Sequence, residues 1–293
     1  MPDRVLKELV VISGKGGTGK TSIVASFAAL AGPVVTADCD VDAADLHLLL
    51  DPKIERREPF PGGLKAAIDA EKCTSCGKCL ELCRFGAVQA ANSIYSIDEI
   101  ACEGCGVCAY FCPEDAISLE VEDGGEWFVS STRFGPMSHA RLKAGGENSG
   151  KLVTIVRREA KRLAVENGLG LILADGSPGI GCPVIASVTG ADYALIVTEP
   201  SASGFHDLER VIDLADHFDI ETAILVNKCD INKEMTENIE RFAREKGLLF
   251  AGGVRYDESV TGAQMVGKST IESSSGPAAE DIRLAWERIA EKL

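Results

Sequence analysis

The chain has 293 residues, of which 45% are hydrophobic and 26% charged; this ordinary composition excludes disordered and fibrous proteins and allows about two compact units. Acidic residues outnumber basic ones by 45 to 30, for a formal net charge of -15, which disfavours binding to nucleic acid or to a membrane surface because like charges repel. The N-terminal residues lack the apolar segment and cleavage site of a signal peptide, and no apolar run reaches the ~18 residues that span a bilayer, so we expect a cytoplasmic protein with reduced thiols.

The start of the chain predicts an α/β domain. Residues 9–12 form a short apolar run, which is followed by a glycine-rich turn and by helical spacing of apolar residues over 21–32. This order predicts a buried strand, a loop and a helix. A second buried strand is predicted over 33–38, and the acidic loop after it leads into another short helix.

A cysteine-rich and turn-rich segment, residues 65–123, interrupts this pattern. It contains 11 acidic and 4 basic residues, a net charge of -7. Within it the sequences EKCTSCGKCLELCRFGAVQA and IACEGCGVCAYFCPEDAISL align without gaps at a period of 29 residues. Two such copies predict a small domain with pseudo-twofold symmetry, inserted into the α/β domain.

After a polar, glycine-containing connection over 123–150, helices and strands alternate to the end of the chain. The predicted helices cover 149–168, 182–190, 203–218, 235–247 and 278–293, and the predicted strands cover 169–175, 193–200, 222–228 and 248–254. Because the strands are almost wholly apolar, we predict an α/β fold with a mostly parallel, doubly wound sheet covered by helices on both faces. This domain would comprise 1–64 and 124–293, and the insert 65–123 would be a small α+β domain.

The segment between the first strand and the first helix has the P-loop pattern G-x-x-x-x-G-K-[ST]. It reads Gly14, Lys15, Gly16, Gly17, Thr18, Gly19, Lys20, Thr21. Glycines allow backbone N–H groups to wrap phosphates, and the helix N-terminus adds positive potential. We therefore predict that the loop binds ATP or ADP, with Lys20 on the terminal phosphates and Thr21 on Mg²⁺. An accidental glycine-rich turn is the alternative.

The second lysine of this loop, Lys15, makes it resemble the deviant Walker A motif of the MinD/ParA/nitrogenase iron protein superfamily. The resemblance covers about residues 5–52 and 150–293. In that superfamily the additional lysine crosses a dimer interface to the partner's nucleotide. The resemblance implies that Lys15 acts with Lys20 in catalysis. It also implies a dimer that forms around ATP, either a homodimer or a heterodimer with a paralogous subunit. A solvated surface lysine is the alternative.

The same resemblance implies roles for three polar residues at or just after the ends of predicted strands. Asp40 matches the first switch, where a carboxylate orients the attacking water, although a solvated acidic loop is the alternative. Asp175 ends the predicted strand 169–175 and resembles the Walker B residue that holds the Mg²⁺ shell. Asn227 matches the position that reads adenine, and an ordinary turn residue is the alternative there.

Both repeats of the insert have the cysteine spacing C-x2-C-x2-C-x3-C, which resembles that of bacterial two-cluster ferredoxins. The resemblance implies that the fourth cysteine of each repeat completes the [4Fe-4S] cluster of the other. The ligands would be Cys73, Cys76, Cys79 and Cys112 for the first cluster, and Cys102, Cys105, Cys108 and Cys83 for the second. Arg84 stands where the second repeat has Pro113, which removes no ligand. Structural zinc is the alternative.

Three cysteines lie outside the insert: Cys39, Cys182 and Cys229. Lone cysteines are most often small buried side chains. Cys182 lies seven residues after Asp175, the offset at which nitrogenase iron protein carries a cluster ligand. This offset suggests the hypothesis that two Cys182 thiols face each other across a dimer and accept a cluster or metal.

The motifs as a set resemble MinD-superfamily P-loop ATPases that contain a ferredoxin domain, with Mrp-type iron-sulfur carriers among their relatives. We predict an ATPase whose nucleotide-dependent dimerisation is coupled to electron transfer through two [4Fe-4S] clusters, to or from a redox or metalloprotein partner. A cluster carrier of Mrp type is the alternative, although the C-x-x-C near the C-terminus of those proteins is missing here. A membrane- or DNA-bound organiser is disfavoured because the terminal helix lacks a basic amphipathic face.

Overall fold

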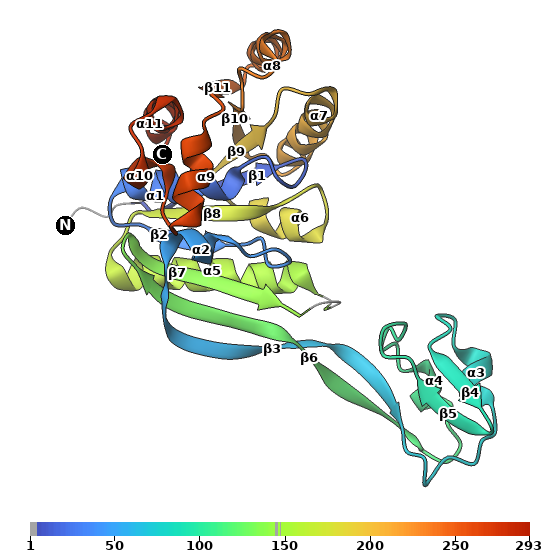
Figure 1. Cartoon of the computed structure of the whole chain (residues 1–293). Helices are drawn as coiled ribbons and strands as arrows, with labels where there is room; N and C mark the ends of the chain where they lie inside the picture. Colours follow the sequence, from blue (N-terminus) through green and yellow to red (C-terminus); the bar gives the residue numbers. More distant parts are fainter. Residues whose placement is uncertain (1–4, 144–145, 147) are drawn as a thin grey trace. The chain divides into compact units, whose positions relative to one another are not determined.

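The computed structural model describes residues 5–143, 146 and 148–293, and it divides the chain into two compact units (Figure 1). The larger unit holds the described residues of Met1–Glu58, Trp127–Arg141 and Ser149–Leu293. The smaller unit holds those of Pro59–Glu126 and Leu142–Asn148. The cysteine-rich segment 65–123 therefore lies within the smaller unit.

The central sheet has nine strands within the described residues. In spatial order these are β11 (Leu249–Val254), β10 (Glu221–Asn227), β9 (Tyr193–Thr198), β1 (Lys7–Ser13), β8 (Leu171–Pro178), β2 (Val35–Asp38), β7 (Gly135–Leu142), β6 (Ile117–Thr132) and β3 (Lys53–Ile68). Every pairing from β11 to β7 is parallel. The predicted mostly parallel sheet is thus confirmed.

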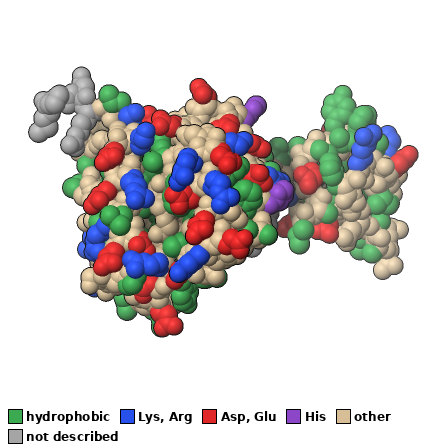
Figure 2. Space-filling model, turned by 90° about the horizontal axis from the view of Figure 1, so that it is seen from above, with side chains coloured by type: hydrophobic (Ala, Val, Ile, Leu, Met, Phe, Trp, Pro, Cys, Tyr) green, Lys and Arg blue, Asp and Glu red, His purple; other side chains and the backbone are tan. Residues whose placement is uncertain are grey.

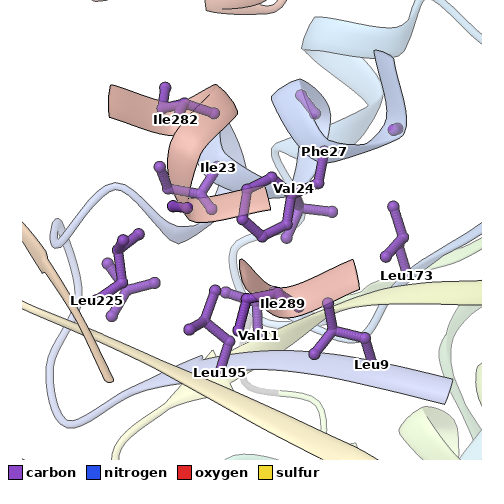
Figure 3. Packing of buried hydrophobic residues seen from close by; sticks show 14 of the residues in the cluster. Leu9, Val11, Ile23, Val24, Phe27, Leu173, Leu195, Leu225, Ile282 and Ile289 are labelled. Atoms are coloured by element: carbon purple, nitrogen blue, oxygen red, sulfur yellow. The ribbon is translucent and has the colours of Figure 1, made fainter. Parts of the chain in front are cut away.

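Helices cover both faces of this sheet. An apolar cluster on one face is packed by α1 (Lys20–Ala31), α2 (Leu46–Leu50), α9 (Glu258–Met265), α10 (Thr270–Ser273) and α11 (Pro277–Ala290) (Figure 3). The other helices of the unit are α5 (Ser149–Asn167), α6 (Cys182–Val188), α7 (Ala202–His217) and α8 (Lys233–Glu245). Within β1, Leu9 and Val11 belong to the cluster, whereas Val10 and Ile12 are equally buried on the opposite face, because successive strand residues point to opposite sides.

The predicted polar connection over 123–150 is wrong for much of its length. Strands β6 and β7 occupy it, and they extend the central sheet beyond β2, with Asp38 of β2 in register with His139 of β7. The sequence of these strands is polar and does not alternate cleanly. His139 is buried nevertheless. A hydrogen bond between its Nε2 atom and the hydroxyl of buried Ser130 on β6, at 2.8 Å, offsets the cost of burying the polar ring. These residues form strands because of their contacts with neighbouring strands, and not because of their local sequence pattern.

The smaller unit is built from two similar halves. Its helices are α3 (Lys78–Leu82) and α4 (Val107–Tyr110), and β4 (Val88–Ala91) pairs antiparallel with β5 (Ile94–Ile97). Each helix begins after a glycine with left-handed backbone, Gly77 with φ 80° and Gly106 with φ 75°. These glycines are one repeat period apart.

Hydrogen bonds between the halves follow the same period. The N–H of Asp69 donates to the carbonyl of Ala116 at 2.8 Å, and the N–H of Asp98 donates to the carbonyl of Ala87 at 2.7 Å. Asp69 and Asp98 occupy equivalent positions in the two repeats, and so do Ala87 and Ala116. The two bonds are therefore equivalent. The sequence repeat is therefore a structural twofold, in which each half bonds to the other.

None of the helices in the described part of the chain is long and apolar enough to cross a membrane. Acidic and basic side chains are interspersed on the face of the larger unit that Figure 2 shows.

Candidate functional site

The P-loop, residues 14–21, joins the end of β1 to the start of α1. Gly17 and Gly19 have φ of 79° and 92°, in the left-handed region that glycine adopts readily. Gly14 lies so close to helix α7 that an added Cβ would be 2.3 Å from the Cβ of Asp207. The loop therefore takes its path because these positions lack side chains. It leads the N-terminus of α1, and with it the buried Lys20, to the end of the sheet where phosphate would bind.

Three carboxylates stand beside the P-loop, near the carboxyl ends of β2 and β8. Asp38 and Asp175 are register partners on these adjacent strands, and Asp40 follows β2. Burial raises the pKa of Asp175 to about 7 and that of Asp40 to about 6, while the charge of Lys20 opposes both shifts. Burial, together with the charges of Asp175 and Asp40, raises the pKa of Asp38 as well. The site therefore holds closely spaced negative charge that lacks full compensation.

Asp175 also presents an oxygen without a hydrogen-bond partner. Its Oδ1 atom is buried and unpaired among the described residues, whereas the carboxylate accepts a hydrogen bond from the side chain of Thr21. A buried, unpaired carboxylate oxygen is costly unless a cation binds it. No three His, Cys, Asp or Glu side chains in the described residues form a group that could by itself hold a single metal ion. Mg²⁺ at phosphates commonly uses only one or two carboxylates, with waters and phosphate oxygens, so Asp175 and Thr21 fit that ion.

Hydrogen bonds connect the loop after β2 to β8. The N–H of Cys39 donates to the carbonyl of Asp175 at 2.8 Å, and the hydroxyl of Ser177 donates to the carbonyl of Cys39 at 2.8 Å. Asp38 in turn accepts from the N–H of Asp40 at 3.2 Å. Both main-chain polar groups of Cys39, the residue before Asp40, are therefore bonded to β8.

Lys15, the second lysine of the loop, lies against residues of its own chain. Its Nζ atom is 3.4 Å from Oε2 of Glu199 and 3.4 Å from the hydroxyl of Ser203. The other carboxylate oxygen of Glu199 accepts a short hydrogen bond from Lys228. The predicted contact of Lys15 with a partner's nucleotide concerns a second chain and stays a prediction.

Asn227 contacts the P-loop. Its Nδ2 atom donates to the carbonyl of Thr18 at 2.8 Å, and its Oδ1 atom accepts from the N–H of Lys228 at 3.0 Å. A Cβ on Gly19 would lie 2.4 Å from Asn227 Nδ2, so the two segments are in close contact. In this structure Asn227 supports the loop, and the adenine contact predicted for it remains a prediction.

The eight cysteines of the repeats surround two separate cavities in the smaller unit. One cavity is lined by Cys73, Cys76, Cys79 and Cys112, and the other by Cys83, Cys102, Cys105 and Cys108; each has a volume of about 20 Å³. Each cavity thus combines three cysteines of one repeat with the fourth of the other, the grouping predicted above. Ligation itself stays a prediction. A [4Fe-4S] cluster uses four thiolates, and these two sets provide that donor chemistry.

Backbone amides point at several of these sulfurs. The N–H of Ala116 lies 3.3 Å from Sγ of Cys112, and the N–H of Ala66 lies 3.5 Å from Sγ of Cys102. Although burial raises the pKa of the Cys83 thiol, the N–H groups of residues 85–88 outweigh it and lower that pKa. Amides directed at sulfur stabilise a thiolate, the form that binds metal.

The remaining cysteines differ in exposure. Cys39 is fully buried, as expected for a lone cysteine, and Cys229 is half-buried. Cys182 is exposed at the start of α6, and its predicted role across a dimer is untested.

The sequence motifs suggest no role for Glu199, which the structure places against Lys15. A signal was present, because Glu199 directly follows the apolar strand β9, and ligands of parallel sheets bind beyond the carboxyl ends of the strands.

Comparison with known proteins gives a family match over most of the chain. Residues 9–271 match the CobQ/CobB/MinD/ParA nucleotide binding domain. The uncharacterized protein MJ0578 of Methanocaldococcus jannaschii is 35% identical over 237 residues, which cover 78% of this chain and 80% of that protein.

Solved structures share the fold. The cell division ATPase MinD of Pyrococcus furiosus has a TM-score of 0.58 at 14% identity, with 98% of this chain and 99% of that chain covered. The septum site-determining protein MinD of Pyrococcus horikoshii, complexed with Mg-ADP, has a TM-score of 0.59 at 13% identity, with 97% and 96% covered. At this identity the likeness concerns the fold alone.

Proposed function

The chain belongs to the CobQ/CobB/MinD/ParA family of nucleotide-binding domains and is a P-loop NTPase, and on this premise we propose that it hydrolyses ATP as a dimer formed around bound nucleotide. The observation that carries this proposal is the arrangement at the end of β1 and β8. There the buried Lys20 of the P-loop lies near Asp175, whose Oδ1 atom is unpaired among the described residues. Mg²⁺, when bound, would neutralise phosphate charge.

Each residue has a distinct part in this proposal. The backbone of residues 14–19 and the ammonium of Lys20 hold the phosphates, and Thr21 and Asp175 hold the cation. Asp40, whose pKa of about 6 leaves it mostly ionised at neutral pH, accepts a hydrogen bond from the attacking water. Lys15 stabilises charge on the phosphates of the second subunit, as an arginine finger does.

Phosphate release and ATP binding, measured on separate variants, test these parts. Lys15→Ala should abolish hydrolysis and retain ATP binding, and Asp40→Asn should do the same. Asp42→Asn is the matched control, because Asp42 is an exposed carboxylate of the same loop. Full hydrolysis by Lys15→Ala would refute the role of that lysine, and equal loss in the Asp42 variant would refute the specific role of Asp40.

We further propose that the smaller unit binds two [4Fe-4S] clusters, one in each cysteine-lined cavity. The support is the grouping of four cysteines around each cavity and the direction of N–H groups to their sulfurs. The buried apolar side chains described in the unit are few, among them Ala66, Ala87, Cys102 and Ile117, and a core this small commonly needs a metal to stabilise it. Such clusters, when bound, supply one-electron transfer.

The cysteine assignment predicts which cluster each variant loses. After anaerobic reconstitution, the wild type should hold two clusters per chain, and Cys112→Ser and Cys83→Ser should each lose one, with different changes in the EPR spectrum. Cys229→Ser, outside the unit, is the control and should retain both. Zinc in place of iron after purification from cells grown with both metals would refute the proposal.

The proposed role is electron transfer, gated by ATP, to or from a redox or metalloprotein partner. The excess of acidic residues over 65–123 would favour a partner with a basic surface. Exposed apolar side chains in the same unit, among them Phe85, Tyr110 and Phe111, would add contact area.

Cluster potentials and iron lability, measured with and without MgATP, separate this role from that of a carrier. A potential that shifts on MgATP while the iron stays bound would support electron transfer. Unchanged potentials with iron lost to a chelator would support the cluster-carrier function of Mrp type.

A further inference from the structure

One carboxylate, that of Glu199, is shared by two lysines beside the P-loop. The strands β1, β9 and β10 are adjacent and parallel, and the residues that follow their carboxyl ends include Lys15, Glu199 and Lys228, respectively. Oε2 of Glu199 lies 3.4 Å from Nζ of Lys15, and Oε1 accepts from Nζ of Lys228. The sheet order therefore creates this triad, since the three residues are far apart in sequence.

The two lysines are held differently. Lys228 lies in a turn with φ 55°, and its N–H donates to Oδ1 of Asn227, which is itself bonded to the P-loop. Within the described residues the Nζ atom of Lys15 has two polar partners, Glu199 and the hydroxyl of Ser203, and Lys15 precedes Gly16, around which space is open. Lys15 is thus the lysine that can leave, and Lys228 is the one that stays.

The second lysine lowers the cost of that departure. The side chain of Glu199 is only 20% exposed, and its pKa is held down, against the effect of burial, by Lys228 first and by Lys15 second. A half-buried carboxylate that lost its one partner would be left with unsatisfied charge. Because Lys228 remains bonded, Glu199 stays paired when Lys15 moves away.

We propose that Glu199 is a positioning residue that retains Lys15 on its own chain before ATP binds and releases it toward the nucleotide of the second subunit. This proposal rests on the proposed function, in which Lys15 acts across the dimer. Glu199 competes with the phosphates for the same ammonium group, so it sets the protein concentration at which ATP-dependent dimers become active.

The first test measures the retention itself, without nucleotide. Wild-type protein is treated with a limiting amine-acylating reagent, and the labelling rate of Lys15 is followed by mass spectrometry, with the exposed Lys151 as internal reference. Glu199→Gln should raise the rate at Lys15 about two- to five-fold, the range expected for loss of a partly exposed ion pair. Lys228→Ala should lower it, because Glu199 then pairs with Lys15 alone. An unchanged or lower rate in Glu199→Gln would overturn the proposal.

The second test measures release. The protein concentration that gives half-maximal specific ATPase activity should fall about two- to five-fold in Glu199→Gln, with the KM for ATP unchanged. It should rise in Lys228→Ala. Glu240→Gln, which removes an exposed ion pair with Arg244 on α8, is the matched control and should change neither quantity. An unchanged or higher concentration in Glu199→Gln would overturn the proposal even if Lys15 labels faster, because Glu199 would then hold the lysine without controlling it.

The two tests distinguish failure of this inference from failure of the proposed function. If the wild type hydrolyses no ATP, the proposed function fails, and the release of Lys15 fails with it. Labelling would still decide whether Glu199 retains the lysine. If Lys15→Ala abolishes hydrolysis but Glu199→Gln has no effect on either measurement, the proposed function stands and the inference falls.

Discussion

Replacing Asp175 by Asn should stabilise the metal-free protein at alkaline pH. The carboxyl of Asp175 is 1% exposed, and its Oδ1 atom has no hydrogen-bond partner among the described residues. Burial raises its pKa from 3.8 to about 7, so the folded state resists the ionised form. Asn is nearly isosteric and neutral at every pH, and it can still accept the hydrogen bond from Thr21.

The sign and the pH window follow from proton linkage. Between pH 3.8 and about 7 the folded chain binds a proton at Asp175 that the unfolded chain has released, so the free energy of unfolding falls as the pH rises. Above pH 7 the loss is complete and amounts to about 4 kcal/mol, at about 1.4 kcal/mol for each tenfold change in proton affinity. Asp38 and Asp40 titrate in the same site, so we expect a measured gain of about 2–4 kcal/mol for Asp175→Asn at pH 8 and almost none at pH 4.

Urea unfolding at a series of pH values, without Mg²⁺ or nucleotide, measures this difference. Asp42→Asn is the control, because its exposed side chain should change the free energy of unfolding by less than about 0.5 kcal/mol. Adding MgADP should remove the advantage of Asp175→Asn, since the ligand binds the folded wild type and stabilises it. A gain that is independent of pH, or a variant less stable than the wild type at pH 8, would refute the electrostatic account of this site.

Three further predictions concern other parts of the molecule. Gly104→Ser should destabilise the smaller unit by about 1–3 kcal/mol, because a Cβ there would lie 1.9 Å from the backbone carbonyl oxygen of Leu64. Faster amide hydrogen exchange would detect this loss. Ser75→Gly, at the equivalent position of the first repeat with nearly the same φ, is the control and should have little effect. Glu8→Gln should lower the free energy of unfolding by about 3–5 kcal/mol in urea, since it leaves the buried guanidinium of Arg157 without its charged partner; a loss below 1 kcal/mol would contradict this. Burial lowers the pKa of His139 from 6.5 to about 4, so the wild type should lose about 3 kcal/mol relative to His139→Phe as the pH falls through this window, and parallel pH profiles would exclude it.

Features that depend on contiguous residues were predicted well. The strand, loop and helix around the P-loop follow from a local pattern, because apolar runs, glycines and helical periodicity act within about 20 residues. The parallel sheet was predicted for the same reason, since buried strands are apolar throughout. The period of 29 residues likewise predicted two similar halves, and Gly77 and Gly106 occupy matching positions in them.

Features that depend on strand order and on distant partners needed the tertiary structure. Strands β6 and β7 could not be predicted, because polar side chains in them, such as Ser130 and His139, find their hydrogen-bond partners across strands. The grouping of cysteines had been expected only from a resemblance. In the structure each cavity is lined by cysteines of both repeats, because hydrogen bonds join the two halves of the smaller unit.

The sequence by itself determined the nucleotide-binding motif, the α/β class and the twofold repeat, because each is written in neighbouring residues. Only the tertiary structure decided what surrounds the reactive groups. The pKa of Asp175 depends on burial between layers, and the pairing of Lys15 with Glu199 depends on β9 lying next to β1. Burial and charge act through space, over a few ångströms, between residues that the chain separates by more than a hundred positions.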